Sequence, residues 1–245
     1  MISEVSGPLR ACPLHGSASA WPDASFKDIQ SGLQHAESSL AGCVRITAVP
    51  ALMGRVLVPA AAAFIRKHPA LRLELVGETR NLDLTRREAD IALRLGRPEP
   101  EAGRQILSRK LGVLSYAAYA PANHPPGDDA GLPWVTYEGM RASQPPARWL
   151  VMAAQSDGRA GVAVNDAEAI LQAVRSGLGR SILPSVIGDQ DIGLRRTVVR
   201  SDLPELPSRE VWLLTHPELR VLSRIGAVSD WLAATIAEAG KPEVS

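Results

Sequence analysis

The hydrophobic and polar positions between residues 42 and 95 change from the spacing of strands to that of a helix and back. Val44–Val49 is a short apolar run, and apolar residues alternate with charged ones over 71–75, as in half-buried strands. Between them, apolar positions recur every three or four residues over 52–65, which predicts a helix. Ile91–Leu95 repeats the strand alternation. This order predicts parallel strands joined by right-handed crossovers.

Prolines shape the helix predicted over 52–65. Pro59 lacks an N–H group and crowds the carbonyl of Arg55, so we expect a kink there. The helix should end at His68, because a residue that precedes a proline avoids helical geometry. A short helix is expected from Asn81 to about Glu88.

A second α/β unit follows, and the chain then returns to the first. The expected strands of this part are Val113–Tyr119, Trp134–Tyr137, Val162–Val164, Ser181–Leu183, Leu194–Val199 and Val211–Thr215. Asn165 or Asp166 caps an expected helix over Ala167–Ser176, and a closing helix follows over 221–236. Two lobes joined by two crossings of the chain would leave a cleft between them.

Composition is that of an ordinary globular protein of 245 residues, with 22% charged and 45% hydrophobic residues. The formal net charge of +1 gives no sign of the basic face that duplex-DNA readers carry. No apolar run is long enough for a membrane span, and the first residues lack the apolar core of a secretory signal. We therefore expect a cytoplasmic protein with no membrane partner.

Motifs for catalysis are missing from the sequence. Gly177-Leu-Gly179 lacks the third glycine of a dinucleotide fingerprint, because Ile182 occupies that place. There is no phosphate-binding loop, zinc-protease helix or nucleophile elbow, and the five histidines lie far apart. We expect no catalytic residues, no metal site, no cofactor and no enzymatic activity.

Three segments and the tail of the chain resemble the effector-binding domain of LysR-type transcriptional regulators. They are Gly42–Val76, Leu82–Glu99, Asn165–Pro184 and Trp212–Leu232. The resemblance implies an α/β fold of two Rossmann-like lobes, similar to type 2 periplasmic binding proteins, with a small-molecule cleft between them. Arg87 departs from the family pattern, since a glycine is common at that place.

The resemblance also implies a division of the chain. Residues 1–25 lack hydrophobic periodicity and are expected to form a flexible arm. Residues 26–41 have helical spacing and are either the remnant of the family's linker helix or an amphipathic helix packed on its own domain. The effector-binding domain would cover 42–240, with lobe I at about 42–117 and 209–240 and lobe II at about 118–208.

The family places a winged helix-turn-helix ahead of this domain, and only 41 residues precede Gly42 here. The favoured interpretation is an effector-sensing domain of a LysR-type regulator, apparently truncated of its DNA-binding domain. DNA would then be reached only through a missing or partner helix-turn-helix. The alternatives are a stand-alone small-molecule binding protein, a dimerising modulator of full-length regulators and, least favoured, an enzyme on the same scaffold. The family implies a homo-oligomer formed through the helices Leu52–Lys67 and Ala167–Ser176.

Ligands of open α/β lobes bind beyond the carboxyl ends of strands, where helix N-termini present free N–H groups. The turn after the first strand has Val49, Pro50 and Ala51 where the family often has a Ser or Thr, so only backbone groups would bind there. Three side chains have a second interpretation: Thr79 as a surface loop residue, Arg94 at a solvent-facing strand end or in an ion pair with Asp90 or Glu99, and Asn165 as a helix cap. The candidate ligand-binding residues are Pro50, Ala51, Leu52, Thr79, Arg94, Thr136 and Asn165.

Overall fold

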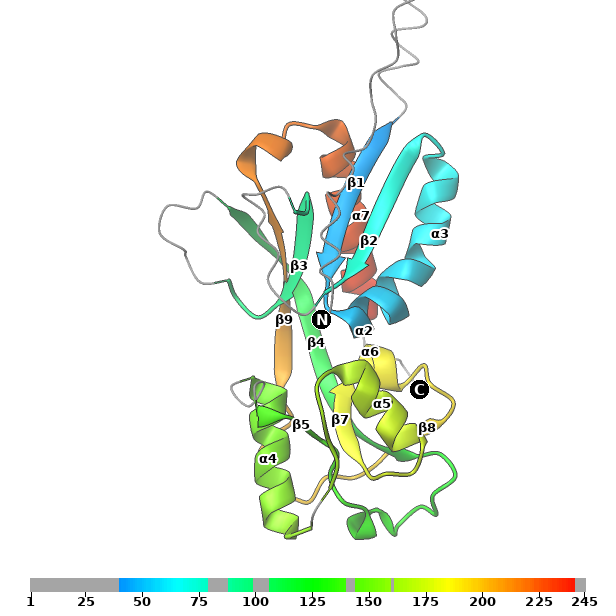
Figure 1. The fold of residues 1–245 in the computed structure, drawn as a ribbon, viewed down its shortest axis with the longest axis vertical. Helices are drawn as coiled ribbons and strands as arrows, with labels where there is room; N and C mark the ends of the chain where they lie inside the picture. The colour runs from blue at the N-terminus through cyan, green and yellow to red at the C-terminus, as the bar shows by residue number, and fades with distance from the viewer. Residues whose placement is uncertain (1–39, 79–87, 99–105, 140–143, 160, 241–245) are drawn as a thin grey trace, which may run out of the picture.

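Two lobes lie end to end along the long axis of the molecule, joined by the strands β4 and β9 (Figure 1). The computed structural model describes residues 40–78, 88–98, 106–139, 144–159 and 161–240. Three predictions therefore fall on residues outside these ranges: Thr79, the arm 1–25, and all but the last two residues of the segment 26–41. The helix expected from Asn81 to about Glu88 is also outside them, except for its last residue.

The first lobe is a sheet covered by helices. Its strands are β1 (Gly42–Ala48), β2 (Leu71–Gly77), β3 (Ile91–Leu95), the first half of β4 (Leu107–Pro121) and β9 (Ser208–Thr215). Strand β1 pairs in parallel with β2 and with β3, which confirms the parallel arrangement predicted from the sequence. Strand β9 lies antiparallel between β3 and β4. The helices of this lobe are α2 (Pro50–Leu52), α3 (Val58–Lys67) and α7 (Ser223–Ala239), with a 3-10 turn η4 (Pro217–Leu219).

The second lobe is built on the other half of β4. Strands β7 (Ser181–Pro184) and β8 (Leu194–Arg196) pair antiparallel with β4, and β5 (Thr136–Tyr137) pairs with β6 (Ala163–Val164). Its helical elements are η2 (Asp129–Gly131), α4 (Pro145–Asp157), α5 (Ala167–Arg175) and α6 (Ser185–Gly188). The carboxylate of Asp166, and not the side chain of Asn165, caps α5 by accepting from the Ala169 N–H at 2.9 Å.

Each lobe has its own hydrophobic core. The first core contains Ile46, Leu57 and Leu232, and the second contains Trp134, Leu150 and Ile170. Along β4, Leu114 belongs to the first core and Tyr116 to the second, so the strand passes from one lobe to the other between these residues. The two-lobed α/β fold predicted from the sequence is confirmed.

A π-helical turn lies directly before Pro59, where the sequence predicts a kink. Residues Met53–Leu57 form this turn, η1, and the Val58 N–H bonds to the Met53 carbonyl. One extra residue in the turn is a common way to adapt a helix to a missing N–H, and such turns are frequent at functional sites. The helix ends at Lys67, with His68 as its C-cap, as predicted.

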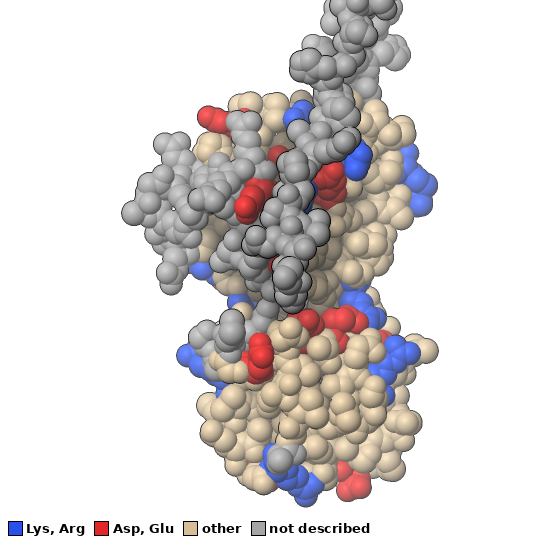
Figure 2. Space-filling view, viewed as in Figure 1, with Lys and Arg blue, Asp and Glu red and all other residues tan. Residues whose placement is uncertain are grey.

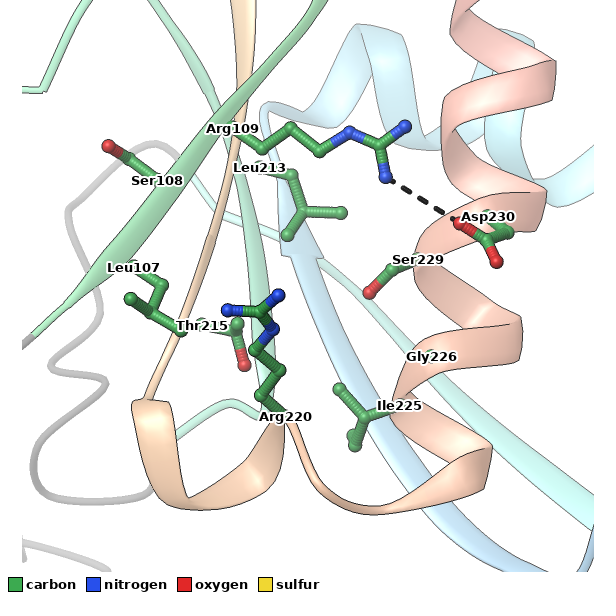
Figure 3. A pocket seen from close by; sticks show the side chains of 10 residues that line it. All are labelled: Leu107, Ser108, Arg109, Leu213, Thr215, Arg220, Ile225, Gly226, Ser229 and Asp230. Atoms are coloured by element: carbon green, nitrogen blue, oxygen red, sulfur yellow. Dashed lines mark ion pairs between the residues drawn. The ribbon is translucent and has the colours of Figure 1, made fainter.

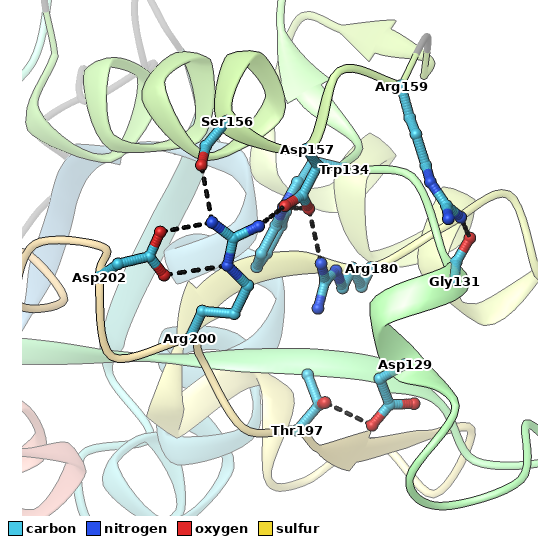
Figure 4. Close-up of polar contacts among 10 residues, drawn as sticks. All are labelled: Asp129, Gly131, Trp134, Ser156, Asp157, Arg159, Arg180, Thr197, Arg200 and Asp202. Carbon is cyan, nitrogen blue, oxygen red and sulfur yellow. Dashed lines mark hydrogen bonds and ion pairs between the residues drawn. The ribbon is translucent and has the colours of Figure 1, made fainter.

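A buried polar network fixes the far end of α4 in the second lobe (Figure 4). The Asp157 carboxylate accepts from Trp134 Nε1 and from Arg180 Nη2, each at 2.6 Å, and from Arg200 Nη1 at 2.8 Å. The Arg180 guanidinium also lies over the Trp134 ring, 4.3 Å from its centroid. Helix α4 was not predicted, because prolines at its first two positions and small residues in its middle leave a weak apolar stripe.

Candidate functional site

A cavity of about 130 Å³ lies between the lobes, at the narrow waist where Lys, Arg, Asp and Glu side chains gather (Figure 2). The first lobe contributes residues of the turn 49–52 together with Arg94 and Leu95. The second lobe contributes Tyr137, Asp166, Ala167, Pro184 and Ile187. The two crossing strands add Tyr116 from β4 and Arg209 from β9. Both lobes and both crossing strands therefore contribute to the walls of this cavity.

The turn Pro50–Leu52 brings the start of a helix to the cavity. This turn starts a helical segment that runs through η1 and α3 to Lys67. Val49 is the N-cap residue and has no side chain that accepts a hydrogen bond, and the first helical bond joins the Met53 N–H to the Val49 carbonyl at 2.9 Å. The N–H groups of Ala51 and Leu52 therefore have no intrahelical acceptor, and the helix dipole favours a negative group beside them.

Arg94 supplies a cation whose guanidinium is only partly hydrogen-bonded by the described residues. Its Nη1 donates to the Leu93 carbonyl at 3.1 Å, whereas its buried Nη2 has no hydrogen-bond partner in the part of the chain that the structure describes. Burial lowers the pKa of the Arg94 guanidinium, and the charge of Glu78 opposes this shift. A buried and incompletely bonded guanidinium is costly, so this one is suited to an incoming carboxylate.

Tyr116 and Arg209 provide a neutral donor and a second cation. Burial raises the pKa of the Tyr116 hydroxyl to about 12, with the charge of Arg209 acting in the opposite sense, so the phenol stays protonated at neutral pH. Arg209 is held in place by hydrogen bonds to the Leu95 carbonyl and, at 3.3 Å, to Gln144 Oε1. With Arg94, these residues bring three side-chain donors to the lining of the cavity.

The second lobe closes the cavity with a carboxylate and a helix start. Asp166 lines the cavity, and its Oδ1 is already bonded to the Ala169 N–H. Its negative charge repels an anion from this wall. A negatively charged ligand group would therefore lie on the side of the first lobe, near Arg94 and the Pro50–Leu52 turn.

The structure brings four of the predicted ligand-binding residues to the cavity, namely Pro50, Ala51, Leu52 and Arg94. Thr136 and Asn165 do not line it; their neighbours Tyr137, Asp166 and Ala167 do. Side chains alternate along a strand, which turns Thr136 away when Tyr137 faces the cavity. Thr79 lies outside the described residues.

The sequence analysis missed Tyr116 and Arg209 as cavity residues. Tyr116 lies in the strand expected at Val113–Tyr119, whereas Arg209 precedes the strand expected at Val211–Thr215. The only signal for them was the expectation of two crossings between the lobes, because a cleft between lobes has the crossing strands as its floor. Ala51 has a further role that the sequence did not show. Its side chain is 5% exposed and belongs to the core of the second lobe, so it packs across the waist.

One family model, described as LysR substrate binding domain, matches residues 37–237. The chain belongs to this family. The match covers both lobes and both crossing strands, so the LysR substrate-binding domain includes every wall of the cavity.

Two curated relatives of this LysR domain are transcriptional regulators. The Mau operon transcriptional activator of Paracoccus denitrificans is 29% identical over 79% of this chain and 65% of its own length. The HTH-type transcriptional regulator PtxR of Pseudomonas aeruginosa is 26% identical over 78% of this chain and 63% of its own length. The chain thus spans less than two thirds of the length of these relatives.

The fold is also that of solved LysR regulatory domains. The regulatory domain of CrgA, a LysR-type transcriptional regulator from Neisseria meningitidis, superposes with a TM-score of 0.64 at 20% identity, over 80% of this chain and 98% of that one. Within the described ranges, no helix is long and apolar enough to span a membrane. The same residues contain no cluster of three or more His, Cys, Asp or Glu suited to a metal ion.

Proposed function

We propose that this LysR domain senses a small organic anion in the cavity between its lobes and thereby controls transcription. The observation that carries the proposal is Arg94, which lines the cavity and whose buried Nη2 has no hydrogen-bond partner among the described residues. A ligand carboxylate would supply the missing acceptor and relieve the cost of that unpaired group.

The other walls support the same ligand chemistry. The free N–H groups of the Pro50–Leu52 turn, the second cation at Arg209 and the neutral Tyr116 hydroxyl all favour oxygen acceptors. The turn offers no Ser or Thr hydroxyl, so recognition there relies on backbone N–H groups. Since the cavity holds only about 130 Å³, a ligand of drug-like size would require the lobes to open.

The route from the cavity to DNA is part of the proposal. The ligand changes the angle between the lobes, and a homo-oligomer formed through the helices Leu52–Lys67 and Ala167–Ser176 passes this change to a helix-turn-helix of the full regulator or of a partner. In this proposal the domain acts in the cytoplasm by binding and not by catalysis, and its two curated relatives are transcriptional regulators.

A thermal-shift screen of small organic acids tests the proposal. A ligand at a hundred times its dissociation constant should stabilise the protein by about 2.7 kcal/mol, a shift of a few degrees for a chain of this size. Arg94→Gln should abolish the shift, and Arg66→Gln, which changes an exposed arginine on α3, should retain it. If Arg94→Gln responds as strongly as the wild type to every hit, the cavity is not the effector site.

A further inference from the structure

A second hollow, of about 420 Å³, lies in the first lobe away from the waist (Figure 3). The start of β4 and the end of β9 form one wall, and η4 with the first turns of α7 forms the other. Arg109 in this hollow and Tyr116 in the inter-lobe cavity are separated by roughly 20 Å along β4, at about 3.3 Å per residue. The hollow is therefore a separate place from the cavity proposed for the effector.

The floor of this hollow is apolar. Leu213 of β9 and Ile225 of α7 line the hollow and are 4% and 2% exposed. Leu107 adds a partly exposed aliphatic side chain at the rim. A volume of this size with an apolar floor is typical of sites for small organic molecules.

Arg220 brings a cation over this floor. Its side chain extends from the end of η4 into the hollow, and Figure 3 shows its guanidinium between the sheet and Ser229 of α7. Arg220 is exposed and Ser229 is half-buried, and among the residues drawn in Figure 3 the Arg220 guanidinium makes no ion pair. The two side chains are therefore donors open to an incoming acceptor.

A second arginine, Arg109, lies at the rim of this hollow. Arg109 Nη1 lies 3.6 Å from Asp230 Oδ1, and both side chains are mostly exposed, at 61% and 78%. Exposed pairs of this kind contribute little and exchange partners easily. Two arginines against one aspartate leave the lining with a net positive charge.

We infer that this hollow is a second ligand site, which binds a small molecule with one carboxylate and an apolar body. The carboxylate lies between Arg220 and Ser229 and accepts hydrogen bonds from both. The apolar body covers Leu213 and Ile225. Arg109 is released from Asp230 to approach the same carboxylate. Neither the volume nor the donor pair belongs to the inter-lobe cavity.

The test uses 4-bromobenzoate, a carboxylate on a flat apolar ring whose bromine can be located by anomalous scattering. We expect a bromine peak over Leu213 and Ile225 in soaked crystals, and millimolar binding by calorimetry. Arg220→Gln should weaken binding at least about tenfold, and Ser229→Val should weaken it less. Arg66→Gln and Arg94→Gln should leave this binding unchanged.

Two outcomes overturn the inference. One is the absence of binding by folded wild-type protein at about 10 mM probe, well above the dissociation constant expected. The other is binding that Arg94→Gln abolishes and Arg220→Gln retains, because the probe then occupies the inter-lobe cavity. That second result would support the proposed effector site while removing this one, so the two proposals fail separately. Thermal melts of each variant show whether it is folded.

Discussion

Arg55 in the first lobe holds Glu168 in the second by two hydrogen bonds. Arg55 Nε lies 3.1 Å from Glu168 Oε2, and Arg55 Nη2 lies 2.6 Å from Glu168 Oε1. On its other side, Arg55 Nη1 lies 3.4 Å from Oδ2 of Asp191, whose side chain is 4% exposed. Arg55 belongs to the π-helical turn η1, and Glu168 to the first turn of α5. The pair connects the segment after the Pro50–Leu52 turn to the helix that closes the cavity.

The first prediction concerns this connection. Glu168→Gln should cost at most about 1 kcal/mol of unfolding free energy, because the two side chains are about a third exposed and water screens the pair. Its main effect should be local: amide hydrogen exchange should rise in η1 and at the start of α5, where the lobes separate more often. Glu205→Gln, at an exposed residue with no ion pair to a described residue, is the matched control. Equal exchange in the two variants would show that the pair does not hold the lobes together.

The second prediction is a loss of stability in acid. Hydrogen bonds from Arg195, Arg55 and Arg196 lower the pKa values of Asp129, Glu168 and Asp189, respectively. A lowered carboxylate pKa in the folded state means that the unfolded chain binds protons first as the pH falls. The stabilisation by these three carboxylates is complete above the ordinary pKa values of 3.8 for Asp and 4.5 for Glu. It is lost as the pH falls through the lower pKa values of the folded state.

Thermal melts between about pH 7 and pH 3 check this sign. The melting temperature should fall below about pH 5, and Glu168→Gln should show a shallower fall, because one of the three carboxylates no longer titrates. A melting temperature that stays constant or rises on acidification would contradict the assignment.

The third prediction separates the buried part of the Figure 4 network from its exposed part. Asp157→Ala removes the carboxylate that pairs with Arg180, whose side chain is only 3% exposed. This change should lower the unfolding free energy by about 3–5 kcal/mol. Asp202→Ala removes the exposed partner of Arg200 and should change stability only slightly. Urea unfolding of the two variants measures the difference. Comparable losses, or a negligible loss for Asp157→Ala, would mean that the buried pair does not anchor α4.

Periodicity predicted the elements with strong apolar patterns. The strands β1, β2, β3 and β7 and the helix α5 all appear where their alternation or helical stripe placed them. The first half of β4 was missed because Ser108, Arg109 and Lys110 are exposed on both faces and show no alternation. The sequence also predicted two crossings between the lobes, but it did not show that a single strand of 15 residues makes the first one.

The candidate site was predictable only in part, since the sequence marks strand ends and not which side chains converge there. Pro50–Leu52 follows a clear strand end, and Arg94 is a charged residue in an apolar run; both were found. Tyr116 and Arg209 converge only because β4 and β9 cross at the waist, a tertiary relationship. The burial of Ala51 against the second core likewise depends on how the lobes pack, so a charged substitution there would disturb the fold as well as the cavity.

The most direct test of the central claim compares a carboxylic acid with its neutral amide. The best acid from the screen and the corresponding amide are titrated by calorimetry into wild type, Arg94→Gln and Arg66→Gln. Wild type and Arg66→Gln should bind the acid at least about tenfold more tightly than the amide, since a charge-assisted bond to a buried guanidinium contributes more than a neutral one. Arg94→Gln should lose this preference while still binding the amide. An acid preference that is the same in all three proteins would show that Arg94 does not bind the effector.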